Sequence, residues 1–237
     1  MLKFFIEDII MKNILARGGI EFLAVLLGIT LSLYIDQKLD ESAIAKTESS
    51  LLSDLQVSLN QDIDYAEIIL DKISTSLDAQ EKLIAFSCNE VDDLNSKDLA
   101  TLFKNVMGGS SSLFPRYGVY RSLVSNSEMK YIENQELKEK LISLYDFQFK
   151  RYENVDPIIT NRYQYSLGDF LVNHFGFTTS QSSTAHMVIN KDAFCQGTLR
   201  KEIMKISGMT KIVYKMVKGI QASMNTVSGL IDEELNQ

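Results

Sequence analysis

The sequence predicts an all-α protein, in which an N-terminal transmembrane helix continues into an antiparallel extracytoplasmic helical bundle. The 237 residues include only two prolines, Pro115 and Pro157, so few positions interrupt a helix. Apolar residues recur at spacings of three and four, and no alternating stretch is long enough to build a sheet. One N-terminal segment is apolar over a length that suits a bilayer crossing.

The apolar segment runs from Gly19 to Ile35, and Glu21 is its only charged residue. As a helix, the part from Ile20 to Ile35 measures about 24 Å, slightly less than a hydrocarbon core of about 30 Å, and the preceding glycines complete the crossing. A buried helix of a soluble protein is the alternative that length alone leaves open. We predict a transmembrane helix over residues 18–36.

A cleaved signal peptide is the second alternative, because the segment is N-terminal and its apolar run is short. The leader before the run is long and contains Glu7 and Asp8, and the first small-x-small triplet lies well beyond the run, at residues 43–45. These features favour a retained signal anchor. Residues 1–17 then form an amphipathic leader, and residues 37–237 form a helical-bundle domain.

The charges around the span predict its orientation. Basic residues precede the span and acidic residues dominate directly after it: Lys3, Lys12 and Arg17 on one side, Asp36, Asp40 and Glu41 on the other. The positive-inside rule therefore predicts a single-pass protein of the inner (cytoplasmic) membrane, with a cytoplasmic N-terminus and a periplasmic C-terminal domain. Membrane lipid is then one partner, and the leader lies on the inner leaflet or packs against another protein.

Four residues of the span share one face of the helix. Glu21, Ala24, Gly28 and Ser32 fall at positions i, i+3, i+7 and i+11. Small residues at this spacing let helices approach closely in lipid, so the stripe is a candidate packing seam for self-association. Glu21 lies near the start of the span, where it is either an interfacial carboxylate or a proton or ion site.

The helical pattern continues without Pro or Gly beyond the span, which predicts one long helix to about Phe86. Further helices are expected over residues 96–106, 117–124, 134–175 and 199–231. Ser96 and Asn134 are the expected N-caps, and a kink or restart is expected near Pro157. Residues 187–189 are compatible with a short strand.

Two features relate the first long helix to the last one. The first is acidic and the last is basic, so antiparallel neighbours would be complementary, although each exposed pair is worth only about 0 to 1 kcal/mol. Cys88 ends the outgoing helix and Cys195 begins the returning one, which makes them a candidate disulfide in an oxidising periplasm. Two separate buried thiols are the alternative.

No pattern of residues indicates catalysis or a cofactor. His174 and His186 are the only histidines, and no Cys or carboxylate cluster at metal-ligand spacing surrounds them. We expect neither an enzyme nor a bound metal, and the net charge of -7 disfavours nucleic acid as a partner. Aromatic residues between 114 and 177 indicate either a helix core or a ligand pocket, in which Arg116, Arg121 or Arg162 would meet an anionic group.

Three stretches carry a resemblance. Residues 19–36 begin with Gly-Ile-Glu, contain the Gly28-Ile29 step and exit at Asp36, and the chain ends in the pattern 231–235. The middle stretch has Ser125, Met129, Ile132, Asn134, Leu137, Leu141 and Tyr145 at a recurrent spacing. Together they resemble an uncharacterised family of bacterial single-pass membrane proteins common in Bacteroidota. In that family Gly and Glu are adjacent, whereas Ile20 separates them here, and Gly is usual where this chain has Ser127.

The resemblance implies a domain of unknown function and brings no catalytic residues with it. The sequence as a whole favours a membrane-anchored interaction or scaffold protein of the cell envelope, which forms a homo-oligomer or joins other envelope proteins. An extracytoplasmic ligand-sensing module, which signals through a partner, is the alternative.

Overall fold

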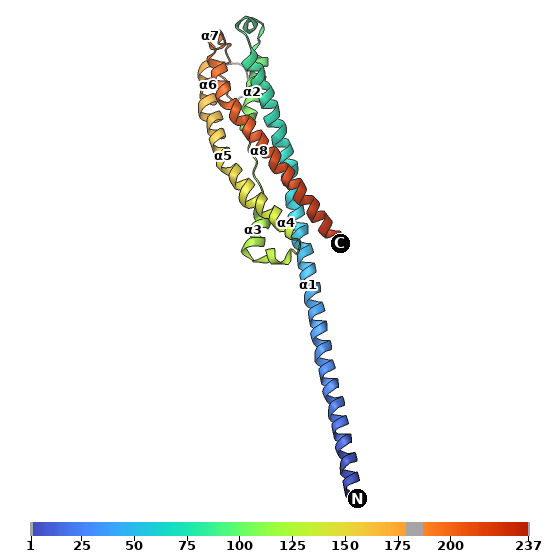
Figure 1. Cartoon of the computed structure of the whole chain (residues 1–237). Coiled ribbons are helices and arrows are strands. Elements are labelled where there is room, and N and C mark those ends of the chain that lie inside the picture. Colours follow the sequence, from blue (N-terminus) through green and yellow to red (C-terminus); the bar gives the residue numbers. More distant parts are fainter. Residues whose placement is uncertain (1, 179–186, 237) are drawn as a thin grey trace. The chain divides into compact units, whose positions relative to one another are not determined.

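The computed structural model describes the backbone of residues 2–178 and 187–236, and the side chains of this part of the chain from residue 22 onward. The chain divides into two units, residues 1–50 and residues 51–237. Every regular element among the described residues is a helix, which confirms the predicted all-α class (Figure 1).

The first unit is the N-terminal part of α1 (Leu2–Ala85). Its large apolar side chains from Phe22 to Ile35 are exposed, and in the described part of the chain α1 is the one helix long and apolar enough to cross a membrane. Exposure continues through residues 37–50, where only Glu48 is half-buried. Packing therefore starts at Leu51 and not at residue 37, where the bundle domain was predicted to begin. The reason is that residues 37–50 contain few apolar side chains.

The second unit contains the rest of α1 and twelve further helices. They are η1 (Cys88–Asp93), α2 (Ser96–Met107), η2 (Gly108–Ser110), α3 (Gly118–Ser125), η3 (Glu128–Tyr131), α4 (Gln135–Ile142), η4 (Ser143–Phe149), α5 (Lys150–Asn161), η5 (Arg162–Gly168), α6 (Asp169–Phe175), α7 (Lys191–Cys195) and α8 (Thr198–Leu235). The helices from α4 to α6 follow one another without a break, and we call residues 135–175 the middle helix. α1 from Leu51 onward, the middle helix and α8 form the three long sides of a bundle, in which α1 and the middle helix run in the same direction and α8 runs antiparallel to both (Figure 1).

The middle helix passes through Pro157 without ending there. Pro157 lies inside α5, between the buried side chains of Tyr152 and Ile159, whose packing holds the helix together although one backbone hydrogen bond is missing. The predicted restart near Pro157 is therefore wrong. The departures from α-helical bonding are the π-helical segments η4 and η5 on either side of α5.

The helix ends follow ordinary capping chemistry. Asn134 caps α4 as predicted, since its side chain accepts a hydrogen bond from the Leu137 N–H at 3.0 Å. The cap of α2 is Asn95 rather than Ser96, because the Asn95 side chain accepts from the Asp98 N–H at 2.8 Å. Residues 187–189 form no strand.

A buried polar cluster joins the three sides of the bundle. The Tyr163 hydroxyl, in η5, lies 2.8 Å from both Gln80 Nε2 of α1 and Thr210 Oγ1 of α8. Ser76 Oγ donates to the Val106 carbonyl at 2.6 Å. Gly109 packs against this cluster, because a Cβ at that position would lie 2.0 Å from the Tyr163 hydroxyl oxygen. Burial raises the pKa of Tyr163, which stays a neutral hydrogen-bonding group.

Candidate functional site

The two cysteines meet at one end of the bundle. Cys88, in η1, and Cys195, at the end of α7, form a disulfide with their Cα atoms 4.7 Å apart. The rings of Phe86 and Phe194, which flank the cysteines in sequence, pack with centroids 5.7 Å apart. The disulfide closes a sequence separation of 107 residues and ties the end of α1 to the start of α8.

The predicted seam in the span is only partly described. Ala24, Gly28 and Ser32 are exposed, and a Cβ added at Gly28 would meet nothing within 4 Å. The side chain of Glu21 lies outside the described residues. The described part of the stripe is thus free for packing between helices, and self-association through it stays a prediction.

The three arginines of the predicted ligand pocket lie at separate places. Arg116 is bound to the buried carboxylate of Asp62, with its backbone N–H donating at 2.8 Å and Nη1 donating at 2.5 Å. Arg162 is exposed on η5, in a shallow hollow with Tyr165. Arg121 lies elsewhere, with its guanidinium carbon 4.8 Å from the centre of the Tyr117 ring. The arginines therefore do not form one anion site.

Arg121 lines a hollow of about 400 Å³ beside a cluster of tyrosines. Tyr120 stacks on Tyr145 with ring centroids 4.3 Å apart, and its hydroxyl donates to Asp146 at 2.7 Å. Burial and the hydrogen bond to Asp146 raise the pKa of Tyr120, whereas hydrogen bonds from Lys150 and Tyr120 lower the pKa of Asp146. The aromatic residues thus form core packing, with one polar hollow at its edge.

The histidines do not form a metal site in the described residues. His174 packs its ring against Phe170 at 4.4 Å, and His186 lies outside the described residues. No group of three His, Cys, Asp or Glu side chains in the described part of the chain is arranged to hold a metal ion.

A groove with a largely apolar lining lies between the middle helix and α8. It encloses about 450 Å³. Phe147 of η4 and Ile212 of α8 line it with side chains that are 62% and 55% exposed. Met216 and the buried Ile220 line the rest of the α8 side. Exposed apolar side chains gathered in a hollow commonly mark a surface that contacts another molecule.

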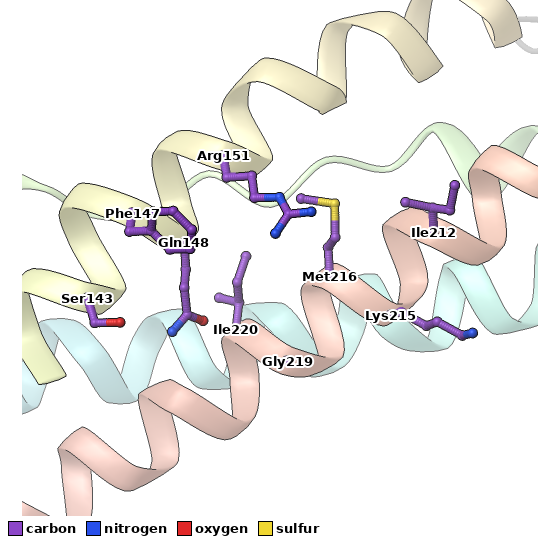
Figure 2. A pocket seen from close by; sticks show the side chains of 9 residues that line it. All are labelled: Ser143, Phe147, Gln148, Arg151, Ile212, Lys215, Met216, Gly219 and Ile220. Atoms are coloured by element: carbon purple, nitrogen blue, oxygen red, sulfur yellow. The ribbon is translucent and has the colours of Figure 1, made fainter.

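Two cations border this groove. Figure 2 shows Arg151 extending from α5 toward Met216, and Lys215 next to Met216 on α8. Neither cation forms an ion pair with any residue that the structure describes. Gly219 also borders the groove, and a Cβ at that position would meet nothing within 4 Å. The groove therefore combines apolar surface, two unpaired positive charges and a place where a backbone is accessible.

Sequence reasoning missed the groove, although α8 carries a signal for it. The buried stripe of α8 proceeds through Ile206, Thr210, Val213, Val217 and Ile220. Ile212 is an extra apolar residue beside this stripe, and helical spacing alone does not show whether it faces the core. Its exposure depends on where the middle helix lies.

The comparisons with known proteins identify no relative: no family model, no curated protein and no solved structure matches this chain. The resemblance to the bacterial membrane-protein family therefore stays a prediction.

Proposed function

We propose that this chain is a membrane-anchored interaction or scaffold protein of the cell envelope, acting through contacts with further copies of itself or with other proteins and not through catalysis. The observation that carries the proposal is the exposure of the apolar side chains of α1 from Phe22 to Ile35. Such a helix is costly to expose to water and stable in hydrocarbon. From Leu51 onward the same helix forms one side of a folded bundle.

The proposed location is the inner membrane, with the N-terminus in the cytoplasm and the bundle in the periplasm. The distribution of Lys and Arg around the span supports this orientation. The disulfide between Cys88 and Cys195 supports it independently, because such bonds persist in oxidising compartments and are rare in the cytosol.

Affinity purification of the tagged full chain from native membranes, followed by mass spectrometry, tests this function. We expect a second, differently tagged copy or another envelope protein to be recovered in amounts comparable with the bait. Residues 1–50 alone serve as the control for contacts made only by the anchor. Recovery of the full chain alone, as a monomer, would contradict the proposal.

The alternative function, ligand sensing, draws on the hollow beside Arg121. That hollow offers Arg121 and Lys150 to an anionic group, opposed by Asp146 and Glu153. A thermal-shift screen of small anions on the full chain separates the two functions. A saturable thermal shift that Arg121→Gln abolishes favours ligand sensing. If neither the native chain nor the variant shows a shift, the sensing function is ruled out.

A further inference from the structure

We propose that the groove between the middle helix and α8 receives the outer face of α1 from a second copy of this chain, with Ile68 at the centre of the contact. This inference deepens the proposed function and rests on it, because it names the partner and the two surfaces through which copies would associate.

The surface that enters the groove is an acidic face of α1. Asp64, Asp71 and Asp78 follow one another at intervals of seven residues and are exposed, as is Glu67. Residues seven apart lie on the same side of a helix, so the acids form one face. Ile68 lies on the same side of the helix, and its side chain is 52% exposed. This acidic face, defined as these five residues, presents one apolar side chain among four carboxylates.

The core does not explain the exposure of Ile68. The neighbouring residues Ala66, Ile69 and Ile73 are buried in the hydrophobic core, on a different side of α1 from Ile68. A half-exposed isoleucine leaves apolar surface in water, and covering that surface is favourable. A contact with the apolar groove of another copy would remove both Ile68 and Phe147 from water.

The charges of the two surfaces are opposite. Between residues 54 and 78, Lys72 is the only basic residue of α1. Asp64, Glu67 and Asp71 form no ion pair with any described residue, which is also true of Arg151 and Lys215. Charges left unpaired within a chain provide complementarity between chains, which aligns partners and selects among them.

The two surfaces also lie at the same level along the bundle. Within one chain, Lys211 Nζ meets Glu81 at 3.4 Å and Ser228 Oγ meets Asn60 at 3.2 Å. The α8 side of the groove, residues 212–220, falls between these two contacts, so it is level with the part of α1 that contains Ile68. Two bundles placed side by side with parallel axes bring Ile68 of one opposite the groove of the other.

Gly219 allows the close approach that this contact requires. Glycine inside a helix is less stable than alanine, and no atom of the same chain lies within 4 Å of the place that a Cβ at Gly219 would occupy. A helix packed in the groove would pass next to this glycine. Because the groove and the acidic face are different surfaces, the contact is heterologous and leaves one of each unfilled unless the copies close into a ring.

Cysteine cross-linking of the full chain in membranes tests the pairing. Two differently tagged copies are co-expressed, one with Ile68→Cys and the other with Gly219→Cys, while the native cysteines stay bonded to each other. We expect a mixed disulfide between the tags on mild oxidation. Gly208→Cys is the matched control: it is exposed on α8, lies about 16 Å along the helix from Gly219 on nearly the same face, and should cross-link weakly.

Charge reversal supplies the second measurement. Arg151→Glu combined with Lys215→Glu should lower the cross-linked fraction roughly tenfold, because attraction between the two surfaces becomes repulsion. Asp64→Lys with Asp71→Lys in the other copy should restore cross-linking. If the reversed variants had only lost their fold, the lysines in the other copy would not restore cross-linking.

Other outcomes overturn the inference in distinguishable ways. Copies that co-purify without the cross-link between positions 68 and 219 would leave the proposed function intact and refute this pairing. A cross-link from position 219 to a different protein would show that the groove binds that protein, and it would refute the pairing of two copies. A chain that co-purifies with nothing would refute both proposals.

Discussion

Gly109 leaves the space that two side chains of the buried polar cluster occupy. An added Cβ would lie 2.0 Å from the Tyr163 hydroxyl oxygen and 2.5 Å from Ser76 Oγ, and both atoms are held by other hydrogen bonds. We expect Gly109→Ala to lower the free energy of unfolding by about 1–3 kcal/mol. Denaturant unfolding, followed by the near-UV circular dichroism of the buried tyrosines, measures this change.

Gly208→Ala is the matched control for Gly109. Gly208 is an exposed residue inside α8, and its added Cβ would meet nothing within 4 Å. Alanine there should raise the free energy of unfolding by about 0.5–1 kcal/mol. Equal effects at the two positions would show that Gly109 is not packed as described.

Ser127 is a second residue whose backbone determines its best side chain. Its φ of 57° lies in the left-handed region, which costs an L-amino acid about 1–2 kcal/mol and costs glycine little. We expect Ser127→Gly to stabilise the bundle by about 0.5–1 kcal/mol, part of the gain being lost to the greater freedom of the unfolded chain.

The neighbouring residue provides the comparison for Ser127. Asn126 has an ordinary φ of -86°, so Asn126→Gly should destabilise the bundle. Thermal unfolding of the two variants in parallel checks the opposite signs. A destabilising Ser127→Gly would mean that this turn does not hold the left-handed conformation.

The roles of some single residues could be predicted from the sequence, and those of others could not. Asn134 was predictable as a cap because a side-chain acceptor precedes a helical pattern by one position. Asn95 and Ser96 are adjacent and both residue types are good N-caps, so the sequence could not show which of them caps α2. Arg116 looked free for a ligand because its partner, Asp62, is 54 residues away in the chain.

At the scale of elements, the disulfide joins η1 to α7 and so holds the end of α1 near the start of α8. It links Cys88 to Cys195 across 107 residues, which the chain-entropy model makes worth about 4–5 kcal/mol. Replacing both cysteines by serine should lower the free energy of unfolding by about that amount. Denaturant unfolding of this variant and of the native chain, each without reductant, measures the difference.

Reduction of the native chain provides an internal control for the disulfide. Reductant should move the native unfolding midpoint toward that of the serine variant and leave the variant unchanged. An identical midpoint for the native chain with and without reductant would contradict the closed loop.

The long helices were predictable and their irregularities were not. The spacing of apolar residues located the end of α1 and both ends of the middle helix and α8 to within a few residues, because each of these parts buries one continuous stripe. It did not show that α1 is continuous from Leu2, since its first part buries no such stripe. The spacing of apolar residues does not reveal the π-helical segments η4 and η5. Pro157 indicated a break, but the packing of Tyr152 and Ile159 overrides the local cost.

At the scale of the whole molecule, the sequence predicted an anchor and a helical bundle but not the surfaces of that bundle. Ile212 and Phe147 are apolar residues that a periodicity cannot distinguish from core residues. Their exposure, 55% and 62%, follows from the packing of three helices that are distant in sequence. The charged partners proposed for this groove, Asp64 and Asp71, likewise became informative only once their exposure was known.

The proposed topology has the chain cross the membrane once, with its bundle on the outer side. Labelling of single engineered cysteines with a membrane-impermeant maleimide tests it most directly, because the bonded native pair does not react. Ser42→Cys, just after the span, should react in intact cells, whereas Asn13→Cys, before it, should react only after the membrane is permeabilised. The reverse pattern, or equal labelling of both positions in a chain released from the membrane, would contradict the account.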